Sequence, residues 1–261
     1  MTIHVGTSGW SYDHWAGVLY PPGLPAAEHL GCYTQSFQTV ELNSSFYRWP
    51  RSTTFGGWRR RLPDGFALSV KAPRGLTHAK KLDAPETWVQ RISAGWHELG
   101  DKPAVLLVQL APKHARDDAR LGYLLELLPR WIRVAVELRH PTWVDEDVFA
   151  LLERHGAAYC VMSGAHLPCV LRATAPFVYV RLHGPDADHL YGGSYTTADL
   201  RWWADRLREW QGAGKEVFVY FNNDGHGHAV NNARELLREL GEPRRSASHP
   251  VPSKASSSIL G

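Results

Sequence analysis

The chain has few cysteines and no long hydrophobic run, and each shortage argues against a class of protein. Its three cysteines, Cys32, Cys160 and Cys169, are an odd number without a CxxC pair. We therefore expect no disulfide framework, and we expect the protein to reside in a reducing compartment. No apolar run reaches about 18 residues, and no basic and then apolar leader follows Met1, so neither a membrane span nor a signal peptide is predicted. We expect a cytoplasmic protein.

The chain also has little net charge. Its 29 Lys and Arg residues against 26 Asp and Glu residues leave a net charge of +3, which is too small to indicate nucleic-acid binding from bulk charge alone. The hydrophobic fraction of 44% and the charged fraction of 21% are typical of a globular protein. A length of 261 residues suits one α/β barrel, which commonly takes about 250.

Short runs rich in Val, Leu, Tyr and Phe recur along the chain and predict strands. Stretches with helical periodicity separate most of them, and one such helix begins with a capping box at Thr196–Asp199. The predicted strands are Ile3–Ser8, Thr39–Asn43, Phe66–Lys71, Ala104–Leu110, Arg133–Arg139, Ala158–Ser163, Phe177–His183 and Val217–Asn222.

Eight strands alternating with helices predict the α/β class and a single (β/α)₈ TIM-type barrel. An open, doubly wound sheet is the alternative, but no GxGxxG motif follows the first strand. The barrel domain is expected over residues 1–240. Residues 241–261 are basic and rich in Ser and Pro, which predicts a disordered tail.

Alternation along the strands places polar side chains inside the barrel. In the second strand Val40 and Leu42 share one face, and Glu41 and Asn43 share the other. The inward faces of several strands carry charges near their C-terminal ends, where barrel enzymes have their active sites. These charged residues are Glu41, Lys71, Glu137, Arg139 and Arg181.

An unpaired buried charge costs several kcal/mol, so these charges predict a functional pocket. The alternative is a set of internal ion pairs, such as Glu41 with Lys71 or Glu137 with Arg181. The excess of cations favours an anionic ligand, either phosphorylated or carboxylated. A glycine-containing loop, Asn222–His228, leads into a helix and is a further candidate anion site, as is the glycine-rich Tyr191–Tyr195.

We assign candidate roles on this basis. Glu41, Glu137 and His183 are the candidate catalytic acid and base groups. The candidate substrate-binding residues are Ser8, Trp10, Asn43, Tyr47, Lys71, Arg74, Gln109, Arg139, Arg181, Tyr220, Asn222, Asn223, Asp224 and Gly225. No metal ligand and no cofactor is assigned. A divalent metal at Asp224, His226 and His228 is an alternative.

Seven motifs in order resemble the YecE-like family, which is family 72 of the domains of unknown function. They are Gly6–Tyr12, Val40–Tyr47, Val70–Arg74, Leu106–Leu110, Glu137–Trp143, Val180–Gly184 and Tyr220–Asp224. The resemblance covers about residues 2–240 and leaves out the tail. It implies a TIM-type barrel but no reaction, because the family is named for lacking one.

The leading hypothesis for function is an enzyme that acts on an anionic small molecule by carboxylate and histidine acid–base chemistry. Hydrolysis, isomerisation and lyase chemistry all remain open. Two alternatives are a protein that binds or processes nucleic acid and a sensor that binds a metabolite without turnover. Basic runs such as Arg59–Arg61 favour the former. Neither a membrane partner nor an oligomeric state is predicted.

Overall fold

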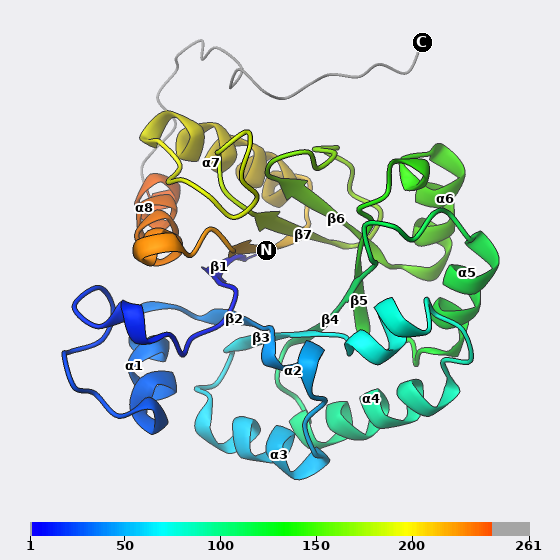
Figure 1. Cartoon of the computed structure of the whole chain (residues 1–261), viewed down its shortest axis with the longest axis horizontal. Helices are drawn as coiled ribbons and strands as arrows, with labels where there is room; N and C mark the ends of the chain where they lie inside the picture. Colours follow the sequence, from blue (N-terminus) through cyan, green and yellow to red (C-terminus); the bar gives the residue numbers. More distant parts are fainter. Residues whose placement is uncertain (1, 242–261) are drawn as a thin grey trace.

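The computed structural model describes residues 2–241 and consists of a parallel barrel with helices around it (Figure 1). The strands are hydrogen-bonded in the order β1-β8-β7-β6-β5-β4-β3-β2, and every pair is parallel. The strands are β1 (Ile3–Thr7), β2 (Thr39–Leu42), β3 (Ala67–Lys71), β4 (Ala104–Gln109), β5 (Arg133–Glu137), β6 (Ala158–Ser163), β7 (Phe177–Leu182) and β8 (Glu216–Phe221). All eight predicted strands are confirmed, with ends that differ by up to two residues.

The helices lie on the outside of the strands, as Figure 1 shows. They are α1 (His29–Ser36), α2 (Ser44–Tyr47), α3 (Ser52–Arg61), α4 (Glu86–Leu99), α5 (Asp118–Leu127), α6 (Glu146–His155), α7 (Thr197–Gly212) and α8 (His228–Gly241). The predicted capping box is present at the start of α7, where Thr196 and Asp199 bond each other's backbone N–H groups. Residues 164–176, between β6 and β7, contain no helix, and Pro168 and Pro176 interrupt this stretch.

The barrel closes between β1 and β2 through a single bridge and one tyrosine. Ser8 pairs with Glu41 in a parallel bridge, and the Gly9 N–H donates to the Glu41 carbonyl at 2.7 Å. A Cβ on Gly6 would lie 2.2 Å from the Thr39 carbonyl oxygen, so glycine is needed for this approach. The Tyr33 hydroxyl accepts from the Thr7 N–H and donates to the Thr39 carbonyl, each at 3.0 Å. The Tyr33 hydroxyl thereby bridges the backbones of β1 and β2 in place of direct backbone hydrogen bonds between them.

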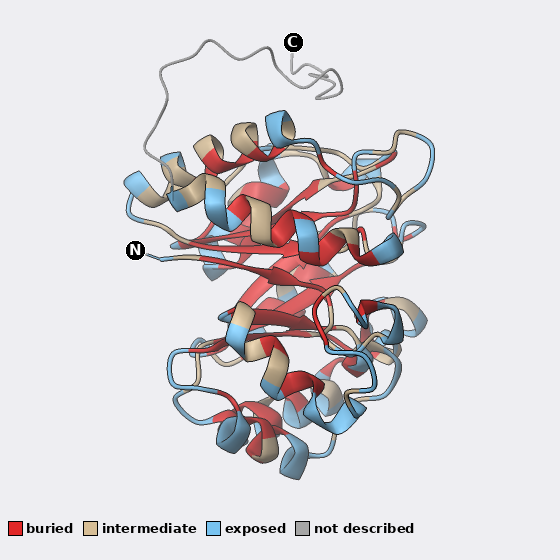
Figure 2. Ribbon diagram, turned by 90° about the vertical axis from the view of Figure 1, so that its left-hand side faces the viewer, coloured by how far each residue is buried: buried red, intermediate tan, exposed pale blue. Residues whose placement is uncertain are grey.

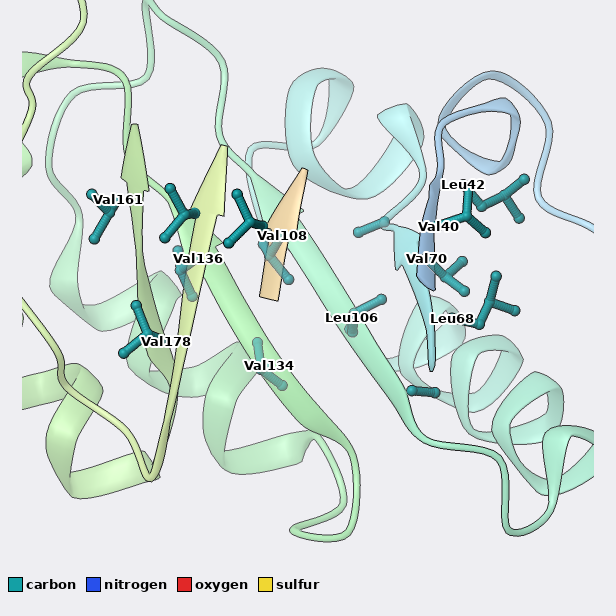
Figure 3. Close-up of a cluster of buried hydrophobic side chains, with 14 of the residues drawn as sticks. Val40, Leu42, Leu68, Val70, Leu106, Val108, Val134, Val136, Val161 and Val178 are labelled. Carbon is teal, nitrogen blue, oxygen red and sulfur yellow. The ribbon is translucent and has the colours of Figure 1, made fainter. Parts of the chain in front are cut away.

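The hydrophobic core lies between the barrel and its helices (Figure 2). Val40 and Leu42 of β2 and Leu68 and Val70 of β3 are buried in it, and Figure 3 shows such residues in the layer. These are the residues that alternation assigns to the outward face. The prediction that the apolar face meets the helices is therefore confirmed.

The barrel interior changes from apolar to charged along its axis. Phe177 and Phe218 lie near the N-terminal ends of their strands, with ring centroids 5.9 Å apart. Two residues further along are Tyr179 and Tyr220, with centroids 5.2 Å apart. Arg181 lies two residues beyond Tyr179 in β7. We call the end of the barrel beyond Arg181 the mouth. The expected tail lies, apart from Gly241, outside the described residues.

A separate ion-pair cluster lies at the opposite end of the barrel. Glu216 accepts from His4 at 2.8 Å and from Arg133 at 2.6 Å, which links β8 to β1 and β5. The hydrogen bond from His4, together with the Arg133 guanidinium, lowers the pKa of Glu216 to about 2. This cluster joins three strands at the end of the barrel where their N-termini lie.

The low pKa of Glu216 predicts a contribution to stability at neutral pH that is lost in acid. Its contribution is complete above the unfolded-state pKa of about 4.3 and is lost as the pH falls toward 2. The stability lost on Glu216→Gln should therefore be larger at pH 6 than near pH 2.5, as measured by urea unfolding. Glu153→Gln removes an exposed partner of Arg172 and should cost less than about 1 kcal/mol at either pH. A difference between wild type and Glu216→Gln that is constant with pH would contradict this assignment.

Candidate active site at the barrel mouth

Arg181 lies at the centre of the site and binds two carboxylates. Its Nε and Nη2 donate to Glu41 at 2.9 and 2.7 Å, and its Nη1 donates to Glu137. All three side chains are at most 1% exposed. The two predicted catalytic carboxylates, on β2 and β5, therefore meet across the barrel through an arginine on β7. Of the two ion pairs suggested as an alternative, Glu137 with Arg181 is present, whereas Glu41 pairs with Arg181 and not with Lys71.

Each carboxylate also accepts bonds from other side chains of the barrel. Glu41 accepts from the Ser8 hydroxyl at 2.7 Å and the Tyr179 hydroxyl at 2.8 Å. Glu137 accepts from the Gln109 amide at 2.6 Å and from Arg139 Nε. Every carboxylate oxygen thus has at least one donor, which is what buried charges require.

These partners decide the ionisation of Glu137. Burial by itself would raise the pKa of Glu137, but Arg181 and Arg139 outweigh it and hold the pKa well below its usual range. Glu137 is therefore ionised at neutral pH. Its catalytic role, like that of Glu41 and His183, stays a prediction.

Lys71 lies beside this cluster but has a different environment. Its Nζ lies 4.5 Å from the centroid of the Phe46 ring, and within residues 2–241 it forms no ion pair and no hydrogen bond through its side chain. The backbone is held in place, because the Ser45 hydroxyl donates to the Lys71 carbonyl at 2.7 Å. Burial, with the charge of Arg181 in addition, lowers the pKa of Lys71 to about 8.

His183 is fully buried just after β7 and is neutral. Burial lowers its pKa well below the ordinary value, and Arg181 lowers it further. Its Nδ1 lies 3.2 Å from the Asn222 amide nitrogen, which can only donate, so Nδ1 accepts and Nε2 carries the proton. Nε2 has no partner among the described residues. Tyr191 packs edge-on against this ring at 5.3 Å and accepts a bond from Arg139.

An open cavity of about 420 Å³ lies at the mouth, next to Phe46. Tyr47, Arg74, Gly75, His78 and Ala79 line it. The Phe46 ring contacts His78 edge-on at 4.9 Å and Lys71 through its face. The volume of the cavity lies within the range of small-molecule sites, about 300–1,000 Å³.

The side chains of the loop after β8 hold neighbouring loops together. The Asn223 amide donates to the Gly193 carbonyl at 3.0 Å and to Asn232 at 2.9 Å. Asp224 accepts from the Trp15 indole at 2.7 Å and from His14 at 2.9 Å. The glycine-containing loop therefore has its own carboxylate near the start of α8. Burial raises the pKa of that carboxylate.

Within residues 2–241, the other predicted binding residues form no hydrogen bond with Arg181. Trp10 packs edge-on against Trp58 at 6.4 Å, and Tyr47 is 80% exposed. Tyr220 is the register partner of Arg181 on β8, and its hydroxyl bonds Thr39 and Ser69. Asn43 precedes α2, and Gly225 begins the short 3₁₀ turn before α8.

Four residues of this region were not among the candidate catalytic or substrate-binding residues: Phe46, His78, Tyr179 and Tyr191, although Tyr191 begins the glycine-rich loop Tyr191–Tyr195. Alternation predicts that Tyr179 lies on the inward face two residues before Arg181, although no binding role was assigned to it. The other three lie in loops or short helical turns, where no periodicity reports the direction of a side chain. These four residues are mainly aromatic and border the charged cluster.

Two further findings concern partners of the chain. Among the described residues, no three His, Cys, Asp or Glu side chains are grouped so that they could hold a metal ion. That includes Asp224, His226 and His228. Over the same residues, no helix has the length and apolarity that crossing a membrane requires.

Comparison with known families identifies the chain. A family model described as "Protein of unknown function DUF72" matches residues 4–256. The chain belongs to the DUF72 family. The match extends past residue 240, where the motifs were expected to end. The chain is 28% identical to UPF0759 protein YunF of Bacillus subtilis, over 91% of this chain and 94% of YunF. It is 26% identical to UPF0759 protein YecE of Escherichia coli K12, over 53% of this chain and 49% of YecE.

Solved DUF72 structures have the same fold. A DUF72 family protein from Thermotoga maritima aligns with a TM-score of 0.83 at 28% identity, over 93% of this chain and 100% of that one. One from Enterococcus faecalis aligns with a TM-score of 0.78 at 19% identity, over 94% of this chain and 97% of that one. This DUF72 protein is thus a TIM-type barrel, as the strand count predicts.

Proposed function

We propose that this DUF72 protein is an enzyme that binds a small anionic molecule at the barrel mouth and exchanges protons with it. The observation that carries the proposal is the uneven pairing of charges there. Glu41 and Glu137 are fully engaged by Arg181 and their other donors. Lys71 and Arg74 form no ion pair within residues 2–241. The mouth therefore offers cations whose counter-charge a ligand would supply.

The arrangement supports an assignment of roles. Arg74 lines the cavity and would bind a carboxylate or phosphate. Lys71 has a pKa of about 8, and a group whose pKa is close to the working pH is suited to proton transfer. His183 would donate from Nε2 as a neutral imidazole, which suits polarisation of a carbonyl oxygen.

Glu41 or Glu137 would take part in proton transfer only if a substrate replaced one of its present hydrogen-bond donors. Their position between Arg181 and their other donors, Tyr179 and Gln109, favours a supporting role. They keep Arg181 charged and fixed, and with Arg139 they set the electrostatic potential of the mouth. This is preorganised electrostatics, which contributes to catalysis without proton exchange.

A thermal-shift screen tests the proposal. Phosphorylated sugars, nucleotides, organic acids and short oligonucleotides are each added with and without Mg²⁺, Mn²⁺ or Zn²⁺. A ligand at about 100 times its Kd should add about 2.7 kcal/mol of stability, which is a rise in Tm of about 5–10 °C for a chain of this size. We expect small organic anions to give this shift and the neutral analogues to give none.

Two variants and one control locate the binding site. The shift should be lost in Arg74→Gln and reduced in Lys71→Met, because each removes an unpaired cation. It should persist in Arg172→Gln, because Arg172 pairs with Glu146 and Glu153 beside α6. A shift by oligonucleotides alone that vanishes steeply with salt would replace this proposal by nucleic-acid binding. No shift by any anion would contradict the proposal.

A further inference from the structure

Lys71 differs from the other cations deep in the mouth because no acceptor in the described part of the chain holds its charge. Arg181 and Arg139 each donate to a carboxylate. Among the aromatic and ionic groups of the described residues, only the face of the Phe46 ring lies within contact distance of Lys71 Nζ. The distance from Nζ to the ring centroid is 4.5 Å. The end of β3 aims a lysine into a site where the available carboxylates are already bound by arginines.

The charges around Lys71 come from several elements and do not cancel at its amine. Arg181 of β7 and Arg139 after β5 favour the neutral amine, whereas Glu137 of β5 and Glu41 of β2 favour the ammonium. His78, on the turn after β3, is neutral at pH 7 because burial lowers its pKa to about 4. Burial of Lys71 is the largest influence and also favours the neutral amine. A lysine that is desolvated beside other cations is the usual setting of an amine nucleophile.

We propose that Lys71 forms an imine with the carbonyl carbon of an aldehyde or ketone that also carries a carboxylate or phosphate. This inference rests on the proposed binding of an anion at the mouth and names the class of substrate. Three features support it together: the unpaired amine of Lys71, the cation of Arg74 in the adjoining cavity, and the unpartnered Nε2 of His183. An oxo acid or a sugar phosphate has the two functional groups that such an arrangement recognises.

The chemistry needs no oxidant, reductant or further reactant. The lone pair of Nζ attacks the carbonyl carbon, and the C=O π electrons move to oxygen, which takes up a proton to give a carbinolamine. The hydroxyl then takes up a second proton and leaves as water, while the nitrogen forms the C=N bond. The two protons that Nζ carried in the neutral amine balance the two that leave in water. His183 is placed among the same charges, since Lys71 contributes to its pKa, and is the candidate donor to the carbonyl oxygen.

Reductive trapping tests the proposal. The full-length protein is incubated at pH 7.5 with pyruvate, glyoxylate, dihydroxyacetone phosphate or glyceraldehyde 3-phosphate and then treated with sodium borohydride. Borohydride converts an imine into a stable secondary amine, so intact mass and peptide mapping locate the adduct. We expect the adduct at Lys71 to exceed that at Lys215 by about tenfold or more, because the pKa of Lys71 is lowered and its amine has no acceptor among the described residues, whereas the Lys215 amine already donates a hydrogen bond. Lys215 is a partly buried lysine at the other end of the barrel, where it donates to the Ala175 carbonyl.

Controls separate imine formation from anion binding. Lys71→Met should remove the adduct, and omission of borohydride should leave no stable adduct. Acetone has a carbonyl but no anionic group, and it should give at least tenfold less adduct than pyruvate. Lactate and glycerol 3-phosphate have the anion but no carbonyl, so they should shift the Tm without being trapped.

The outcomes distinguish failure of each proposal. A Tm shift by lactate or glycerol 3-phosphate without any adduct from the carbonyl compounds would overturn the imine and leave anion binding standing. Equal trapping of acetone and pyruvate at Lys71 would overturn the substrate class and the proposed anion site. An adduct spread equally over Lys71, Lys102 and Lys215 would be nonspecific and would overturn the imine. Neither shift nor adduct would overturn both proposals.

Discussion

Arg181→Met is expected to lower the free energy of unfolding by about 3–5 kcal/mol. The substitution keeps an unbranched side chain but removes the only guanidinium that bonds both Glu41 and Glu137 within the described part of the chain. Both carboxylates are fully buried, so water does not replace the lost partner. The cost is that of leaving ionised groups uncompensated in the interior. Urea unfolding at pH 7, followed by tryptophan fluorescence, measures it.

Arg172→Met is the matched control for Arg181→Met. Arg172 also pairs with two glutamates, Glu146 and Glu153, but all three side chains are at least 40% exposed. Exposed pairs contribute up to about 1 kcal/mol, so this variant should be nearly as stable as wild type. Adding Glu41→Gln and Glu137→Gln to Arg181→Met should recover part of the lost stability, because the charges left unpaired are then absent. Equal losses in Arg181→Met and Arg172→Met would contradict the assigned role of Arg181.

Lys71→Met is expected to have the opposite effect and to stabilise the protein at pH 7 by about 1–3 kcal/mol. The pKa of Lys71 is lowered from 10.5 to about 8 in the folded state, and each pKa unit corresponds to about 1.4 kcal/mol. Its partial exposure to solvent reduces the effect below the full conversion. Residues at functional sites often lower the stability of the fold, so replacing one of them can stabilise the protein while reducing its activity.

The dependence of this gain on pH has a definite sign. Between pH 8 and 10.5 the unfolded chain binds more protons at Lys71 than the folded chain does, so wild-type stability rises relative to Lys71→Met. The advantage of the variant is therefore complete below pH 8 and disappears as the pH approaches 10.5. Lys102→Met, which removes bonds to Asp64 and the Pro63 carbonyl, should destabilise slightly or have no effect. A Lys71→Met variant that is less stable than wild type at pH 7 would contradict the picture of an unpaired, desolvated amine.

The fold and the inward face of the barrel could be predicted from sequence because both depend on local regularities. A strand alternates its faces every residue, so the pattern Val40, Glu41, Leu42 assigns the carboxylate to the interior without knowledge of any other strand. The same rule places Glu137, Arg139 and Arg181 inward. Eight such runs, mostly separated by helical patterns, then favour a closed barrel.

The pairing of the charges could not be predicted in this way. Glu41 and Lys71 lie on neighbouring strands and were a reasonable ion pair, but Glu41 is bonded by Arg181, 140 positions away in the chain. Likewise, the loop after β8 has the composition of an anion site, but Trp15, 209 positions away, holds the Asp224 carboxylate there. Such contacts depend on the distance and direction between elements that the chain connects only remotely.

The sequence alone determined the eight strands, the side chains that point into the barrel and the concentration of charge at one end. These follow from backbone geometry, which acts between residues that are close in the chain. Only the tertiary structure decided that two arginines neutralise the two carboxylates and that Lys71 has no acidic partner among the described residues. Coulombic attraction and hydrogen bonding act through space, so the partner of each charge is set by how the closed barrel brings remote strands together.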